Sequence, residues 1–342
     1  MQYTNTKPRV SVFMPVYNAE QYLNESIDSI LKQSFTEFEF VIVNDGSTDR
    51  SAEVIKAYSD PRIRFIENPQ NLGLIASLNI GLETCKGEYI VRMDQDDISL
   101  PQRIEKQVRF MDENPEYGLI GCWFEDFGEN IENKVVRYSS DDTHIRIRHL
   151  YQTHIAHPTA VIRKSEIDQF NLRFNPEFVH GEDYAFWVTL SAHCKLSNYP
   201  EMLVRKRDHP RNISNKYAQT QRDTCARVKL GQFAKMGIEI SREEIELYTR
   251  FANPDWDFTA PEMGMMHNLL ERMTHANEQS QFIPSPVFNS YLAEKWFHLC
   301  LQNRLIGSRG YTWWNGLSFR KAYKPHFKSK IRLAVQSIGI IR

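Results

Sequence analysis

The sequence predicts an α/β fold in which a mainly parallel β-sheet is flanked by helices, with a helical region at the C-terminal end. Over the first third of the chain, short apolar runs alternate with segments of helical spacing, which is typical of βαβ crossovers and a parallel sheet. From residue 215 onward, helical spacing and many aromatic residues replace this alternation. We therefore expect an α/β domain made of two halves, 1–110 and 111–215, and a helical region at 216–342.

Each expected element follows from its own local pattern. Apolar spacing such as that of Leu23, Ile27 and Ile30 predicts helices, whereas compact apolar runs bounded by turn formers predict strands. The expected strands are Val10–Asn18 (closed by a turn at Pro15), Phe38–Asp45, Arg62–Asn68, Glu88–Met93, Tyr117–Gly128 and Pro158–Ser165. The expected helices are Glu20–Ser34, Ser51–Ser59, Ile75–Lys86, one starting near Leu100, and Glu182–Cys194.

Composition narrows the class of protein. The 342 residues are 41% hydrophobic, enough to bury a large core, and the net charge of −1 argues against a molecule that binds polyanions over its whole surface. The five cysteines are scattered without a C-x-x-C pair, which favours a reducing compartment over a disulfide framework. No signal-peptide pattern and no apolar run of about 20 residues is found, so we expect a cytoplasmic protein.

Three acids follow the apolar strand in the segment GEYIVRMDQDDISLP: Asp94, Asp96 and Asp97. A solvated turn, with Asp97 or Ser99 capping the next helix, explains one of them. It does not explain all three, because like charges held this close repel each other. Asp94 and Asp96 are two residues apart and share one side of an extended chain, which suits Mg²⁺ or Mn²⁺ bound mostly through a diphosphate.

Polar residues after the first two strands allow two interpretations. Tyr17 and Asp45 lie in turn-rich segments, so they can simply form turns. Alternatively, the aromatic ring stacks on a nucleobase and the carboxylate accepts a hydrogen bond from an N–H such as N3 of uracil. Arg92 likewise either pairs with a neighbouring acid or contacts a phosphate or ribose. The sequence leaves both choices open.

A second pair of acids, Glu182 and Asp183, directly precedes the apolar stripe of an expected helix. Acids are favoured at a helix N-terminus by the dipole, so a structural role accounts for the pair taken alone. The functional interpretation is a general base that takes the proton of a sugar hydroxyl. His209 lies in a later polar loop, where it can complete a metal shell or contact a diphosphate.

Taken together, these motifs resemble the family-two glycosyltransferases with the GT-A fold. VSVFMPVYNAEQYLNESIDSILKQS, VIVNDGSTDRS, NLGLIASLNIGL, GEYIVRMDQDDISLP and GEDYAFWVTLS occur in the order and approximate spacing of that family, over roughly residues 9 to 215. The segments GLIASLNIGL, EDYAFW and YPEMLVRKRDHPRNIS look like bacterial β-1,3-N-acetylglucosaminyltransferases that extend lipooligosaccharide or O-antigen chains. The resemblance implies an inverting transferase that uses a UDP-sugar with Mn²⁺ or Mg²⁺.

The resemblance also implies a role for each candidate residue. Segment 1–110 would bind the nucleotide sugar through Pro15, Tyr17, Asp45, Arg92, Asp94, Gln95 and Asp96. The metal ligands would be Asp96, Asp94 and His209, although the extra acid after the D-x-D leaves open which two acids touch the ion. Segment 111–215 would bind the acceptor, with Asp183 as catalytic base and with Asp97 and Glu182 contacting acceptor or donor sugar.

The implied reaction moves GlcNAc, GalNAc or another hexose from UDP to a saccharide or lipid-linked oligosaccharide in the synthesis of O-antigen, lipooligosaccharide or capsule. One alternative is a nucleotidyltransferase that makes the nucleotide sugar, but MPVYNAEQY lacks the glycine and lysine of a triphosphate loop. Another is a non-catalytic module that binds UDP, which would not need to retain Asp183.

The C-terminal tail is basic, because every charged side chain from Lys295 to Arg342 is positive. Between Arg320 and Arg342 these charges alternate with aromatic and aliphatic residues. A packed terminal helix with a solvated basic face is one interpretation. The other is an interfacial segment that contacts anionic lipid at the inner face of the cytoplasmic membrane. No nucleic-acid motif accompanies the tail, so we expect no nucleic-acid partner.

Overall fold

The computed structural model describes residues 8–129, 131–212, 216–253, 257–303, 305–306 and 309–337. The chain divides into two compact units. The first comprises Met1–Ile145 and Thr153–Cys225, and the second comprises Arg146–Gln152 and Ala226–Arg342. The assignment of donor and acceptor functions to the segments 1–110 and 111–215 stays a prediction.

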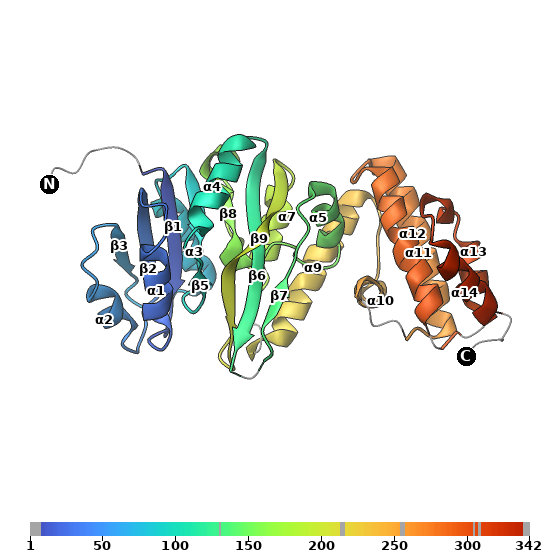
Figure 1. Cartoon of the computed structure of the whole chain (residues 1–342), viewed down its shortest axis with the longest axis horizontal. Coiled ribbons are helices and arrows are strands. Elements are labelled where there is room, and N and C mark those ends of the chain that lie inside the picture. The colour runs from blue at the N-terminus through green and yellow to red at the C-terminus, as the bar shows by residue number, and fades with distance from the viewer. Residues whose placement is uncertain are drawn as a thin grey trace. The chain divides into compact units, whose positions relative to one another are not determined.

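The first unit is built on one sheet with the strand order β3-β2-β1-β4-β8-β6-β9-β5 (Figure 1). Its parallel half consists of β1 (Val10–Val16), β2 (Phe38–Asn44), β3 (Ile63–Glu67) and β4 (Tyr89–Arg92). The other half is mixed and consists of β5 (Ile98–Ser99), β6 (Tyr117–Gly128), β8 (Val161–Arg163) and β9 (Lys195–Asp208), with β7 (Lys134–Val136) paired to β6. The sheet and its flanking helices confirm the predicted fold class.

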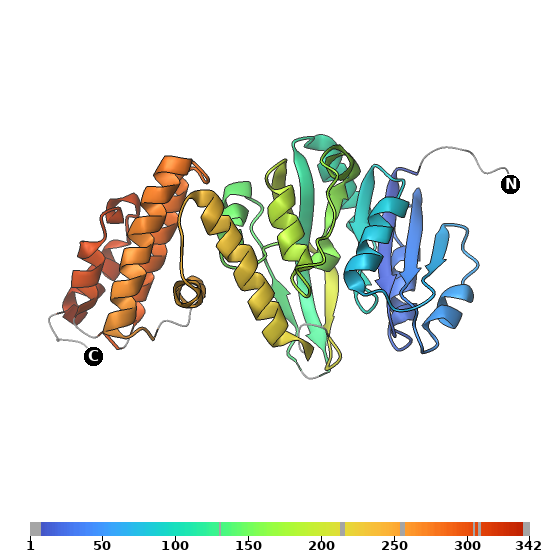
Figure 2. The same ribbon diagram turned by 180° about the vertical axis from the view of Figure 1, so that it is seen from behind.

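Helices cover both faces of this sheet, as Figures 1 and 2 show from opposite sides. Val12 and Met14 of β1 pack on one face and Phe13 on the other, so the strand is apolar throughout. The first face is covered by α1 (Leu23–Leu31), α2 (Ser51–Lys56) and α4 (Arg103–Glu113). The second is covered by α3 (Leu74–Thr84), α6 (Lys164–Gln169) and α7 (Glu182–Leu190), with α5 (Asp142–His149) contributing Ile145.

The strand order brings several candidate residues to the carboxyl ends of neighbouring strands. β1 pairs with β2 on one side and with β4 on the other, so the connections after β1 and β4 leave the sheet in different directions. In open α/β sheets, ligands bind at such a switch point beyond the carboxyl ends of the strands. Tyr17, Asp45 and Asp94 follow the ends of β1, β2 and β4.

Two local expectations were wrong. Pro15 lies inside β1 and not in a turn. Proline is tolerated there because the β1–β4 ladder ends at the pair Phe13–Arg92. On that side β4 offers no further partner, so a backbone N–H at Pro15 is not needed. The helix expected near Leu100 begins instead at Arg103, after the short strand β5, so neither Asp97 nor Ser99 caps it.

Strand β9 was not expected, because its second half, with Arg205 and Lys206, reads as a polar loop. The charges are paired across the strands: Arg205 Nε lies 2.6 Å from Glu125 Oε2, and Lys206 Nζ lies 2.9 Å from Asp126 Oδ1, both on β6. Pro200 lies where the β6–β9 register shifts, which removes its need for a ladder hydrogen bond.

The second unit is helical, as predicted for this part of the chain. Its elements are the later part of α9 (Ala218–Met236), α10 (Arg242–Ala252), α11 (Ala260–Ser280), α12 (Ser285–Gln302), α13 (Gly310–Gly316), the short 3₁₀ helix η3 (Arg320–Ala322) and α14 (Phe327–Ser337). Tyr248, Phe251 and Trp296 lie in its core. The five cysteines are free thiols. Among the described residues, no helix is both long and apolar enough to span a bilayer.

Candidate active site

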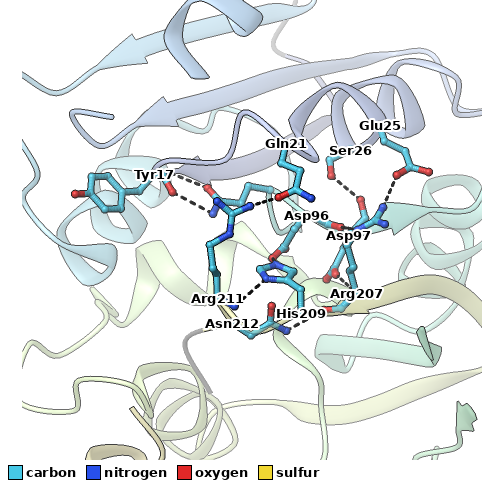
Figure 3. Close-up of polar contacts among 11 residues, drawn as sticks. Tyr17, Gln21, Glu25, Ser26, Asp96, Asp97, Arg207, His209, Arg211 and Asn212 are labelled. Carbon is cyan, nitrogen blue, oxygen red and sulfur yellow. Dashed lines mark hydrogen bonds and ion pairs between the residues drawn. The ribbon is translucent and has the colours of Figure 1, made fainter. Parts of the chain in front are cut away.

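The acid loop is tied to the end of β1 by an amide side chain. The backbone N–H of Tyr17 donates to Gln95 Oε1 at 2.7 Å, and Gln95 Nε2 donates back to the Tyr17 carbonyl at 3.2 Å. Tyr17 is 42% exposed, so its ring is available to a ligand at the carboxyl end of β1 (Figure 3). Gln95 thus positions the loop, and its predicted contact with a nucleotide sugar stays a prediction.

Asp45 is buried at the end of β2 and holds the loop that leads into α3. Its Oδ1 accepts hydrogen bonds from Asn68 Nδ2 at 2.8 Å and from the Leu72 N–H at 2.9 Å, and its Oδ2 accepts one from the Gly73 N–H at 2.9 Å. Because a carboxylate offers about four acceptor positions, one remains for a ligand donor. The sequence did not reveal this structural role, since the donors lie more than 20 residues away.

Arg92 joins several predicted residues at the end of β4. Its buried guanidinium lies 2.6 Å (Nη2) from Asp94 Oδ1 and 3.2 Å (Nε) from His157 Nε2. Partial burial opposes ionisation of Asp94, but the charge of Arg92 outweighs this and lowers the pKa of Asp94 below its usual value. Burial and the same guanidinium lower the pKa of His157 to about 3, so His157 is neutral and accepts the Arg92 hydrogen bond.

Asp96 points instead to His209, and Figure 3 shows the two side chains facing each other. The distance from Asp96 Oδ2 to His209 Nε2 is 2.9 Å. His209 Nδ1 accepts the backbone N–H of Arg211 at 3.2 Å, so in the neutral ring the proton lies on Nε2 and is donated to Asp96. The structure therefore separates the D-x-D pair, with Asp94 on Arg92 and Asp96 on His209.

The segment 207–212, which follows from β9, crosses the acid loop. Arg207 binds this loop through its N–H to Asp97 Oδ1 at 2.7 Å and through Nε to the Asp96 carbonyl at 2.9 Å. Three of its residues also contact the start of α1, namely Arg207 with Glu25, His209 with Tyr22, and Arg211 with Gln21 (Figure 3). These contacts bring His209 to the acid loop.

Asp97 is buried under this crossing segment. Its Oδ2 has no hydrogen-bond partner among the described residues. Burial together with the charges of Asp96 and Asp94 raises the pKa of Asp97 well above its usual value. Its predicted contact with an acceptor stays a prediction.

Glu182 and Asp183 occupy the first turn of α7. Burial and the charge of Asp183 raise the pKa of Glu182 to about 7. Burial, partly offset by the Tyr184 N–H that donates to Asp183 Oδ1 at 2.7 Å, raises the pKa of Asp183 to about 6. The charges of Arg92 and Asp94 act on the pKa values of both acids, so the two acid pairs influence each other. Acids with strongly perturbed pKa values are typical of active sites.

The side chains fit a divalent cation that takes most of its ligands from a substrate. Among the described residues, no three His, Cys, Asp or Glu side chains converge as a complete metal site. Adjacent ligands of an octahedral Mg²⁺ lie about 3 Å apart, given bonds of about 2.1 Å, and Asp96 Oδ2 and His209 Nε2 have this spacing. A cation there would replace the Nε2 proton. Asp94, held by Arg92, lies outside this pair.

Two comparisons identify the family. The family model described as "Glycosyl transferase family 2" matches residues 11–170. An uncharacterized glycosyltransferase of Haemophilus influenzae is 36% identical over 249 residues, which cover 68% of this chain and 77% of the relative. The chain belongs to glycosyltransferase family 2.

Two further proteins resemble this chain, one in sequence and one in fold. The O-antigen biosynthesis glycosyltransferase WbnJ of Escherichia coli is 31% identical over 234 residues, covering 66% of this chain and 89% of WbnJ. The solved structure of residues 1–349 of S. aureus TarS, in complex with UDP-GlcNAc, covers 84% of this chain and 88% of that one, with a TM-score of 0.57 and 18% identity. That likeness supports the GT-A fold.

Two residues of this site were missing from the sequence analysis. His157 precedes Pro158 in a short 3₁₀ helix, η1 (His157–Thr159). The one feature of the sequence that could have pointed to His157 is its position directly before an expected strand. Arg207 was given no role there, because an unexpected strand carries it to the acid loop. The roles of the predicted site residues stay predictions.

Proposed function

We propose that this family-two glycosyltransferase is an inverting, metal-dependent enzyme that transfers a hexose from a UDP-sugar to a saccharide acceptor during synthesis of a cell-surface polysaccharide. The observation that carries the proposal is the pair of acids on α7 with raised pKa values, on which the charges of the Arg92–Asp94 ion pair at the end of β4 also act. The name of WbnJ supports O-antigen, and the UDP-GlcNAc bound to TarS makes GlcNAc the first donor to test, with GalNAc and other hexoses next.

On the donor side, Pro15 and the exposed ring of Tyr17 flank the nucleobase, and Asp45 accepts from uracil through its remaining acceptor position. Arg92 and Asp94 face the ribose and diphosphate. Asp96 and His209 would hold Mn²⁺ or Mg²⁺, which would supply positive charge for the departing diphosphate.

On the acceptor side, Asp183 takes the proton of the attacking hydroxyl as its oxygen bonds to the anomeric carbon. The bond from that carbon to the phosphate oxygen breaks at the same time, and UDP leaves with the electron pair. One displacement from the opposite face inverts the configuration. The raised pKa of Asp183 suits the role, because a base with a pKa nearer the working pH takes a proton more readily. Glu182 orients the acceptor or the donor sugar.

A donor panel tests the proposal. The purified chain is incubated with UDP-, GDP- and dTDP-hexoses, with Mn²⁺ or with chelator, and nucleotide release is measured with and without a saccharide acceptor. We expect UDP release from one UDP-hexose, stimulated by Mn²⁺ and by acceptor. Pyrophosphate release from UTP and a sugar phosphate would instead indicate a nucleotidyltransferase. UDP binding without turnover on any acceptor tried would indicate a binding module.

The acceptor is proposed to be a saccharide or a lipid-linked oligosaccharide at the inner face of the cytoplasmic membrane. Incubation with lipid-linked and free oligosaccharides, followed by NMR of the product, tests both points. Inversion predicts a β-linked product from an α-linked UDP-hexose, and retention of configuration would contradict the mechanism.

A further inference from the structure

The second unit carries a groove of about 540 Å³ formed by α13, η3 and α14. Its wall combines cations with aromatic rings, among them Arg320, Lys321, Lys324, Lys330, Tyr311 and Tyr323. Among the described residues no acid lines it, and the sequence holds none after Glu294. The groove is therefore a concentration of positive charge in a chain whose net charge is −1.

The lysines of this groove are not neutralised by neighbours. Among the described residues, Lys321, Lys324 and Lys330 have no ion pair within the chain, whereas Lys56 and Lys106 in the first unit each contact a carboxylate within 3 Å. Unpaired cations around a concave surface attract an anion, and they lose little on binding because no internal pair has to break.

Apolar side chains are exposed next to the groove. On α14, Phe327 is 74% exposed and Ile331 is 46% exposed, one helical turn apart, while Leu333 is buried and fixes the helix to the unit. Tyr311, which lines the groove, is also among the exposed large hydrophobic residues. Water is a poor partner for these side chains, so the surface suits a partner that is anionic and apolar at once.

We propose that this surface binds the phosphate headgroups of an anionic membrane, with the groove taking a headgroup and with Phe327 and Ile331 entering the boundary to the acyl chains. An interfacial helix with a basic face and exposed aromatic and aliphatic residues has this chemistry. A nucleic acid or an anionic glycan would use the lysines and leave Ile331 in water. The proposal extends the membrane location given above, but its test needs neither donor nor acceptor, so either can fail alone.

Vesicle binding by the full-length chain tests the proposal. Cosedimentation is measured with phosphatidylglycerol–phosphatidylcholine vesicles and with phosphatidylcholine alone, at low and high salt. We expect binding to the anionic vesicles only, weakened by salt. Inorganic phosphate and glycerophosphate at millimolar concentration serve as soluble competitors, and we expect them to displace the protein only partly, because they lack the apolar contact.

Two sets of variants distinguish the contribution of the lysine charges to vesicle binding from that of the exposed apolar side chains. Lys321→Gln combined with Lys324→Gln and Lys330→Gln is expected to weaken binding to anionic vesicles about tenfold or more. Phe327→Ser with Ile331→Ser is expected to weaken it further while leaving thermal stability unchanged, since both side chains are exposed. Matched controls are Lys86→Gln with Lys235→Gln, and Phe170→Ser, at exposed positions that are not among the residues lining the groove.

Three outcomes would overturn the proposal. The first is equal binding to neutral vesicles or none to anionic ones. The second is unchanged binding by both sets of groove variants. The third is full displacement by glycerophosphate, which would make the groove a site for a soluble phosphate.

Discussion

Arg92 Nη2 lies 2.6 Å from Asp94 Oδ1, and the charge of this buried guanidinium also acts on the pKa values of the acids of α7. Its charge lowers the pKa of Asp94 and counteracts part of the rise at Glu182 and Asp183. A change that moves Arg92 is therefore expected to alter the pKa values of Asp94 and of the two acids on α7.

His157 positions Arg92 through a hydrogen bond, so we expect stability and kcat to depend on its acceptor atom more than on the rest of its ring. His157→Leu leaves the Nε–H of a buried guanidinium unpaired and is expected to lower the free energy of unfolding by about 2 kcal/mol. It is also expected to reduce kcat and shift its pH profile. His157→Gln retains an acceptor and is expected to recover most of both. Denaturant unfolding and kcat against pH measure this, and equal losses in the two variants would rule out the hydrogen bond as the cause.

The acid limb of the pH–rate profile reports the acids of α7. The base must be ionised to accept a proton, and the pKa values of Asp183 and Glu182 are raised to about 6 and about 7, so turnover is expected to fall as the pH drops through this range. The apparent values belong to the pair, since the two acids interact. The measurement is kcat/KM from pH 4.5 to 8.5 with saturating Mn²⁺. Full activity down to pH 4.5 would indicate a base of ordinary pKa.

Asp96 and His209 are expected to set the affinity for the cation. His209→Ala removes one of two side chains at ligand spacing, so the Mn²⁺ concentration for half-maximal activity is expected to rise tenfold or more. Asp96→Asn is expected to abolish metal stimulation. His193→Ala, a change in a histidine that stacks on Phe170, is the matched control. An unchanged Mn²⁺ requirement in His209→Ala would leave the metal with other ligands.

Gly46 allows the Asp45 loop to pack closely. Its φ is +61°, and a Cβ there would lie 2.4 Å from the backbone carbon of Gln70. Gly46→Ala is therefore expected to lower the free energy of unfolding by about 2–3 kcal/mol and to weaken UDP binding. Gly231→Ala, where a Cβ in α9 meets nothing within 4 Å, is expected to stabilise by about 0.5–1 kcal/mol. If Gly46→Ala does not lower the free energy of unfolding relative to Gly231→Ala, the packing argument is contradicted.

The sequence was most informative where the signal is local. The apolar strands and the helix that carries Asp183 were predicted because their periodicity is set by their own residues. Strand β9 was missed because its charges are balanced by Glu125 and Asp126, which lie 80 positions earlier in the chain. The Arg92–His157 bond and the donors to Asp45 were missed for the same reason: each joins residues brought together only by the sheet.

Asp183→Asn tests the central claim most directly. Asparagine keeps the size of the side chain and an oxygen for the Tyr184 N–H, but it cannot take a proton. We expect kcat to fall about 10²–10⁴-fold while the Kd for UDP, measured by calorimetry with Mn²⁺, stays within about threefold of the unaltered protein. Asp168→Asn, on the surface beside Lys164, is the control and should leave both unchanged. Near-normal turnover by Asp183→Asn would contradict the account.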